Sequence, residues 1–246
     1  MVLLVGLAMT SGCGAHRSTT EQDAGTAPSV GTALDGAVPM SVLDAPLVDV
    51  HGHHTTLGAM RGKVIVLSDV MTLCAESCPI ITASMVTAAR QLDRSPEGQR
   101  VEFVSLTIDP VRDDARHLLA YQRQFPALRN WTVLTGRPAV VARVWDTLGV
   151  WRHRTHVKPP LPRDWVTGAP LTTDIAHTDE LIFIDGSQRF RYEMDGYGDV
   201  PPSMIPHRIY RFMDALGHRN VATPDPGSWT PSQVSQVVHW VLGGTA

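Results

Sequence analysis

Cys74 and Cys78 stand four residues apart in "VMTLCAESCPIITASMV", at the end of an apolar run and directly before Pro79. Cysteines in such a pair can bind a soft metal ion, cycle through a disulfide, or cross-link a loop. Side chains four apart on one helical turn have Cβ atoms about 5–6 Å apart, whereas a disulfide needs about 4 Å. A small rearrangement would therefore close the pair. The spacing alone leaves all three kinds of chemistry open.

The position of the two cysteines favours reactive thiolates. Residues 63–70 form a β-branched apolar run that predicts a buried strand, and Pro79 suits the first turn of a following helix. Open α/β sheets place their sites at the carboxyl ends of strands. The positive end of a helix lowers the pKa of a nearby thiol. We therefore expect the pair to lie at a functional edge of the sheet.

Strand and helix signals alternate along the rest of the chain, which indicates an α/β fold with a mixed or mostly parallel sheet and helices on both faces. Residues 45–57 predict an N-terminal β-hairpin with Gly52 in its turn. The further predicted strands are 101–108, 131–134, 180–185 and 189–194, the last two as a hairpin, and the further predicted helices are 109–125, 137–150 and 207–217, the last ending at Gly217.

Composition limits the possible partners. The chain has 246 residues, 43% of them hydrophobic and 18% charged, which is enough for one large globular domain or two small ones. The net charge is −3, no basic stripe is present, and aromatic residues make up 6%. We therefore expect no nucleic-acid partner.

The N-terminus predicts export and a membrane anchor. Residues 1–13, "MVLLVGLAMTSGC", form a short apolar run that closes on small residues and is typical of a secretion signal. The "TSGC" ending resembles the lipobox of bacterial lipoproteins, in which Cys13 would carry the lipid, although no Lys or Arg precedes the run. The alternative is a soluble chain with an apolar tail. Residues 14–40 are rich in small and polar residues and predict a flexible tether.

Four motifs in order resemble the SCO/SenC family of thioredoxin-like copper proteins: "CAESCP", "TIDPVRDD", "WTVLTG" and "HTDELIFID". The resemblance covers roughly residues 45–217. It implies a thioredoxin-like fold in which Cys74, Cys78 and His177 bind copper. It also implies a part in assembling the dinuclear copper centre of cytochrome c oxidase, with the copper-bearing subunit as partner and with another copper chaperone or a thiol reductant as further partners.

The ligand types agree with copper. Cu(I) prefers soft thiolates, and Cu(II) accepts imidazole beside sulfur, so two cysteines and one histidine serve both states. A structural zinc site would need four ligands, but ligand type alone leaves a catalytic zinc open. We expect a copper metallochaperone in the bacterial cell envelope, with the SCO domain at 41–218. The alternative is a membrane-anchored thiol–disulfide oxidoreductase whose redox pair is Cys74 and Cys78, and a weaker one is a peroxide-reducing relative.

Some features depart from the family or lie outside its motifs. Met71 stands where the family commonly has an aromatic residue, and Glu76 replaces a frequent Asp between the cysteines. Residues 152–174 predict a long Pro-rich inserted loop before His177, and residues 219–246 predict a Pro-rich link and an amphipathic helix. Weaker candidate ligands are Met71, His51, His53, His54, His153 and His156.

Overall fold

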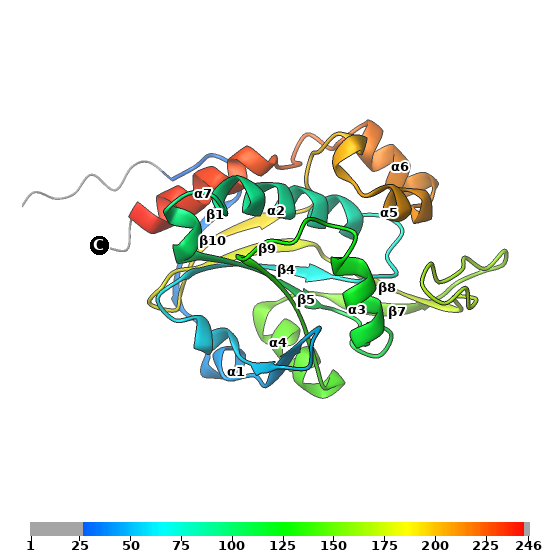
Figure 1. Cartoon of the computed structure of the whole chain (residues 1–246), viewed down its shortest axis with the longest axis horizontal. Helices are drawn as coiled ribbons and strands as arrows, with labels where there is room; N and C mark the ends of the chain where they lie inside the picture. Colours follow the sequence, from blue (N-terminus) through cyan, green and yellow to red (C-terminus); the bar gives the residue numbers. More distant parts are fainter. Residues whose placement is uncertain (1–26, 244–246) are drawn as a thin grey trace, which may run out of the picture.

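The computed structural model describes residues 27–243, and its centre is an eight-stranded mixed sheet (Figure 1). The strand order is β1-β10-β9-β4-β5-β6-β2-β3. The central strands β4 (Val64–Val70), β5 (Val101–Thr107) and β6 (Trp131–Gly136) are parallel. All seven residues of β4 are buried, as expected of a central strand covered on both faces.

Antiparallel strands complete both sides of the sheet. On one side β9 (Glu180–Ile184) pairs with β4, and β10 (Arg189–Asp195) follows it as a hairpin. On the other side β2 (Leu47–Asp49) pairs with β6 and with β3 (His54–Thr55). Gly52 has a φ of +87° in the β2–β3 turn, a conformation that favours glycine. The predicted N-terminal hairpin is therefore confirmed.

Helices cover both faces, and the side chains of β4 alternate between two cores. Val64 and Val66 pack with α2 (Cys78–Leu92), α3 (Ala115–Gln122) and α7 (Pro231–Gly243). Ile65 and Leu67 pack on the opposite face with α1 (Met40–Leu43) and α4 (Pro138–Leu148). This arrangement confirms the predicted thioredoxin-like α/β fold with a central mixed sheet. Among the described residues, no helix is long and apolar enough to span a membrane.

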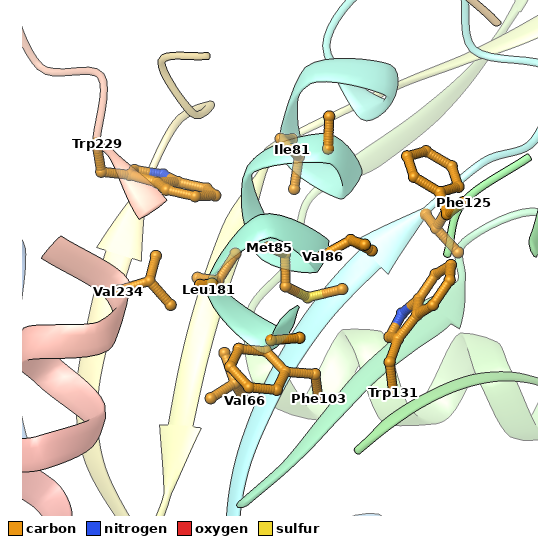
Figure 2. Close-up of a cluster of buried hydrophobic side chains, with 14 of the residues drawn as sticks. Val66, Ile81, Met85, Val86, Phe103, Phe125, Trp131, Leu181, Trp229 and Val234 are labelled. Atoms are coloured by element: carbon orange, nitrogen blue, oxygen red, sulfur yellow. The ribbon is translucent and has the colours of Figure 1, made fainter. Parts of the chain in front are cut away.

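The C-terminal segment belongs to the main core. Trp229 is fully buried, and Val234 of α7 packs into the cluster that also contains α2 (Figure 2). Val237 and Val238 of α7 belong to the same cluster. The short helix α6 (Ala215–Ala222) runs across the predicted boundary at residue 218. The segment after residue 218 contains the predicted helix, as α7, and fills the same hydrophobic core as the central strands.

Two further expectations need correction. The tether predicted over residues 14–40 is wrong in its last part, because β1 (Thr32–Ala37) pairs with β10 through its backbone. The helix predicted over 207–217 is two helices, α5 (His207–Phe212) and α6, because the Asp214 carboxylate caps a new helix by accepting the Gly217 N–H at 2.8 Å. The signal and lipobox at residues 1–13 lie outside the described residues, as does the first part of the tether.

The loop predicted over residues 152–174 contains part of a second, two-stranded sheet. β7 (Arg152–His156) and β8 (Thr173–His177) pair antiparallel, with Arg152 opposite His177. This arm projects beyond the carboxyl ends of the central strands (Figure 1). The remaining elements are short 3-10 turns, η1 (Leu57–Met60), η2 (Glu97–Arg100) and η3 (Pro202–Met204).

Candidate metal centre

The two cysteines flank the start of α2 at the carboxyl end of β4. Cys74 lies in the loop after the strand, and Cys78 is the first residue of the helix. Both are free thiols, 6% and 0% exposed. The backbone N–H of Glu76 donates to Cys74 Sγ at 3.4 Å. The loop thus directs a backbone donor to one sulfur, which stabilises a thiolate there.

His177 completes a group of three ligand atoms. It ends β8, its side chain is 4% exposed, and its Nε2 lies 3.6 Å from Cys78 Sγ. The ligand atoms of Cys74, Cys78 and His177 lie within 4.8 Å of one another. The structure therefore brings together the three residues that the sequence analysis proposed as ligands.

The other nitrogen of His177 faces only acceptors. Nδ1 lies 3.1 Å from the carbonyl oxygen of Thr178, 3.2 Å from Asp179 Oδ1 and 3.3 Å from Asp69 Oδ2. These oxygens hold a proton on Nδ1 and leave Nε2 directed at the sulfurs. Carboxylates in this position orient metal-binding histidines and increase their basicity.

Asp69 and Asp179 were missed in the sequence analysis. Asp69 is fully buried in β4, and its Oδ1 accepts the Glu180 N–H at 3.3 Å. A signal was available, because a carboxylate inside an apolar strand requires a partner. Asp179 follows His177 by two residues and gave no separate signal.

The two thiols have opposite protonation tendencies. A hydrogen bond from the Cys78 thiol holds the pKa of Cys74 well below its ordinary value, with further help from His177. The same hydrogen bond, together with burial, raises the pKa of Cys78 well above its ordinary value. The pair therefore holds one proton and presents Cys74 as the thiolate.

The charge of His177 is maintained by its neighbours. Burial opposes the imidazolium, but the Cys74 thiolate and the carboxylates of Asp69 and Asp179 outweigh it and raise the pKa of His177 to about 10. Burial raises the pKa of Asp69 to about 7 and that of Asp179 to about 6. The metal-free centre thus combines a thiolate, an imidazolium and two carboxylates.

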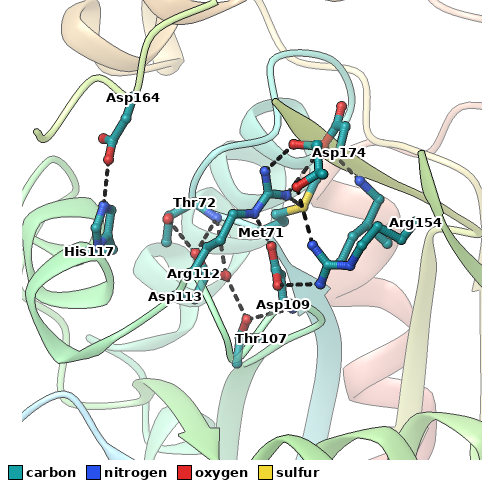
Figure 3. Close-up of polar contacts among 12 residues, drawn as sticks. Met71, Thr72, Thr107, Asp109, Arg112, Asp113, His117, Arg154, Asp164 and Asp174 are labelled. Carbon is teal, nitrogen blue, oxygen red and sulfur yellow. Dashed lines mark hydrogen bonds and ion pairs between the residues drawn. The ribbon is translucent and has the colours of Figure 1, made fainter. Parts of the chain in front are cut away.

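Arg112 connects the cysteine loop to the arm that carries His177 (Figure 3). Its guanidinium donates to Met71 Sδ at 3.3 Å and to the carbonyl oxygen of Thr173, and it pairs with Asp109. It also lies 3.6 Å from Asp174. Because Met71 precedes the cysteines and Thr173 begins β8, this one side chain sets the spacing between the two halves of the centre.

Two further contacts fix the cysteine loop. Fully buried Asp113 accepts hydrogen bonds from the Thr72 N–H at 3.2 Å, from the Thr72 hydroxyl, and from the Thr107 hydroxyl at 2.6 Å (Figure 3). On the other side, the Asp214 N–H donates to the Ala75 carbonyl at 3.0 Å. A side chain at Gly217 would stand 2.4 Å from that carbonyl, so only glycine allows α6 to approach so closely.

A pocket of about 340 Å³ leads to the centre, and its lining includes Cys74, Glu76, Asp174, His177 and Asp179. Its carboxylates favour a cation. Met71 also lines the pocket, and its sulfur accepts a hydrogen bond from the Arg112 guanidinium. The other candidate ligands of the sequence analysis are not members of the metal-type clusters found among residues 27–243: His51, His53, His54, His153 and His156.

The fold and the site together define a thioredoxin-like domain with a buried thiol–imidazole centre. The model of the SCO1/SenC family matches residues 44–213. The chain therefore belongs to the SCO1/SenC family, as the sequence analysis predicted.

Curated relatives agree with this assignment, and a solved structure agrees with the fold. The chain is 29% identical to the SCO1 protein homolog of Bacillus subtilis over 86 residues, which are 35% of this chain and 44% of that protein. It is 32% identical to the human mitochondrial protein SCO2 homolog over 109 residues, 44% of this chain and 40% of that protein. These matches span less than half the length of the relatives. Among solved structures, Bradyrhizobium japonicum ScoI with copper bound has a TM-score of 0.51 at 17% identity, covering 87% of this chain and 99% of that one, and supports the fold.

Proposed function

We propose that this protein binds copper through Cys74, Cys78 and His177 and delivers it to, or prepares, the copper site of cytochrome c oxidase. One observation carries the proposal. In a chain of the SCO1/SenC family, two thiol sulfurs and one imidazole nitrogen converge within 4.8 Å. The solved relative with copper bound makes copper the first metal to test.

The spacing of the donor atoms fits a metal ion. Bonds of about 2.0–2.3 Å, typical of first-row metals with imidazole and thiolate, separate ligand atoms by about 3.5–4.6 Å. The Cys78 Sγ–His177 Nε2 distance of 3.6 Å lies in this range. Soft sulfur favours Cu(I), and the imidazole extends the set to Cu(II). Bound copper would be cargo, which the three side chains hold in a buried place and release to a partner.

Metal analysis tests this proposal directly. We expect the reduced protein to bind one copper ion at this centre and the oxidised protein to bind none there, because a disulfide offers no thiolate. Cys74→Ser and Cys78→Ser should each lose tight Cu(I) binding. His177→Ala should lose most Cu(II) binding and its sulfur-to-copper absorption band but keep Cu(I). Wild-type Cu(II) affinity in His177→Ala would remove His177 from the ligand set.

A second candidate is a thiol–disulfide oxidoreductase that reduces the cysteines of a copper site before loading. The unequal thiols favour it, because Cys74 is the thiolate and Cys78 keeps the proton. Cys74 would attack a partner disulfide and form a mixed disulfide, with one partner sulfur leaving as a thiolate. Cys78 would then lose its proton and attack Cys74, which releases the second thiolate and leaves a Cys74–Cys78 disulfide. The partner gains two electrons, and a thiol reductant must restore the pair.

His177→Ala separates the two candidates. The oxidoreductase needs only the dithiol, so the variant should still reduce a disulfide substrate, whereas copper delivery needs the complete ligand set. If His177→Ala supports oxidase maturation at the wild-type level, the result would favour the oxidoreductase. The number of alkylated cysteines in the folded domain should be two higher with reductant than without it. If both thiols stay free after treatment with an oxidant, the redox cycle is excluded.

We also propose that Cys13 carries a lipid anchor and places the domain outside the cytoplasm, in the bacterial cell envelope. The apolar run ending in "TSGC" supports this proposal. An anchored domain would act near a membrane-bound oxidase, which is the partner that the copper proposal requires.

A further inference from the structure

The tip of the β2–β3 hairpin carries three histidines that the cysteine centre does not use. His51, His53 and His54 are exposed and follow Asp49 at the end of β2. β2 runs antiparallel to β6, so the tip points away from the edge at which β4 leads into the cysteine loop. The three histidines and the cysteine centre are therefore separate features of the molecule.

Asp49 fixes the backbone of this tip. Its Oδ1 accepts the N–H of His51 at 2.8 Å and the N–H of His53 at 2.9 Å. Its backbone carbonyl accepts the Gly52 N–H at 3.1 Å. A single carboxylate oxygen thus holds the two histidines at fixed positions on either side of Gly52, and less freedom is lost when both imidazoles bind one ligand.

The second oxygen of Asp49 prepares one imidazole. Asp49 Oδ2 lies 2.9 Å from His53 Nδ1. This contact holds a proton on Nδ1 and leaves Nε2 as the free donor, the arrangement in which a carboxylate supports a metal-binding histidine. The side chain of His53 is 78% exposed, so Nε2 is open to solvent.

The imidazole of His51 lies at a suitable separation. The ring centroids of His51 and His53 are 6.1 Å apart with the planes tilted by 47°. Metal–nitrogen bonds of about 2.0–2.1 Å place the centroids of two bound imidazoles about 4.5–6.4 Å apart, from right-angle to opposite ligation. Exposed side-chain rotation is enough to direct both nitrogens at one ion. His54 begins β3 directly after His53, and successive side chains along extended backbone point to opposite faces.

We propose that the hairpin tip is a second, solvent-exposed metal site in which His51 and His53 bind one divalent ion of the Cu(II) class, with Asp49 orienting His53. Imidazole nitrogen suits copper, nickel and zinc, and Cu(II) binds most tightly of these. The site has two protein ligands and open positions for water, so its ion exchanges readily with the medium. The proposal is independent of the cysteine centre and of copper delivery.

Cu(II) titration of the Cys74→Ser/Cys78→Ser variant tests the site without the thiolates of the cysteine centre, which would bind or reduce the ion. We expect one bound Cu(II) with nitrogen hyperfine coupling in its electron paramagnetic resonance spectrum. His51→Gln and His53→Gln, each added to this background, should weaken binding at least tenfold. His54→Gln is the matched control at the tip and should bind as the background does. Circular dichroism confirms the fold of each variant.

A second control separates a built site from general histidine binding. His153 and His156 are also exposed, but they stand three apart on β7 and face opposite sides of that strand. His153→Gln/His156→Gln should leave the affinity unchanged. Equal weakening in this control, or full affinity in His51→Gln and His53→Gln, would overturn the proposal. Neither result bears on copper at Cys74, Cys78 and His177, which is measured in the wild-type cysteine background.

Discussion

Raising the pH should strengthen Cu(II) binding at the cysteine centre, and the size of the effect gives the number of protons that the centre releases when the ion binds. At about pH 8 Cys74 is a thiolate, Cys78 keeps its proton, and His177, with a pKa raised to about 10, is charged. Cu(II) held by all three residues requires a second thiolate and a neutral imidazole. Binding must therefore release two protons.

Each released proton increases the affinity tenfold per pH unit. The Kd of the wild type should fall about 100-fold from about pH 8 to about pH 9, which is about 2.7 kcal/mol. His177→Ala releases only the proton of Cys78 and should change about tenfold over the same interval. Asp69 and Asp179, with pKa values raised to about 7 and about 6, are ionised throughout this window and contribute little.

Anaerobic competition with a chelator of known copper affinity, followed through the absorption of the chelator's own copper complex, measures both slopes and also detects the weaker binding that remains in His177→Ala. If the Kd of the wild type changes only about tenfold over this interval, one of the two protons is already absent from the metal-free centre. An equal slope in His177→Ala would mean that His177 does not exchange its proton for copper. Either result would refute the protonation states assigned to Cys78 and His177 in the metal-free centre.

Three further predictions concern the fold and the anchor. Trp229→Ala should lower the free energy of unfolding in urea by about 3–5 kcal/mol, and exposed Trp151→Ala by less than about 0.5 kcal/mol; equal effects would place Trp229 outside the core. Burial raises the pKa of Asp113 from 3.8 to about 7, so folded-state stability is lost as pH rises between these values. The loss in the free energy of unfolding is at most about 4 kcal/mol, and Asp113→Asn should abolish it. If the pH profile of the free energy of unfolding in urea is the same in Asp113→Asn as in the wild type, the prediction is wrong. The expressed protein should partition into detergent and Cys13→Ser into the aqueous phase; equal partitioning would exclude the anchor.

Residues 63–70 and Pro79 show what the sequence could predict. A buried strand and a helix start have local signatures, so the position of the cysteines between them followed directly. The motif "HTDELIFID" led to His177 only through the family resemblance. Its approach to Cys78 depends on β9 pairing with β4 over a long sequence separation. The pairing of β9 with β4 cannot be predicted from a local sequence pattern.

The missed elements are held by contacts that local patterns do not record. β1 has the sequence "TALDGA" and joins the sheet through backbone pairing with β10, which requires no apolar alternation. The 152–174 segment contains most of a hairpin whose register is set partly by Arg112 from another loop, through Thr173. α7 has a sequence typical of a surface helix, yet it covers α2 because Trp229 anchors the segment before it.

The charges of the cysteine centre indicate how the proposed ligand set would hold copper in two oxidation states. In the metal-free state Cys74 carries −1 and His177 carries +1, so the three side chains sum to zero. Cu(II) replaces the protons of Cys78 and His177 and leaves that sum at zero. Cu(I) on two thiolates gives zero only if His177 keeps its proton and stays off the metal.

A buried site resists a change in net charge, because uncompensated charge is costly away from water. Asp69 and Asp179 stabilise an imidazolium that has left the metal, since both carboxylates lie within 3.3 Å of Nδ1. His177 should therefore bind Cu(II) and release Cu(I). Reduction of the bound ion to Cu(I) would therefore leave it with one protein ligand fewer. A partner that offers thiolates could take the ion at this step.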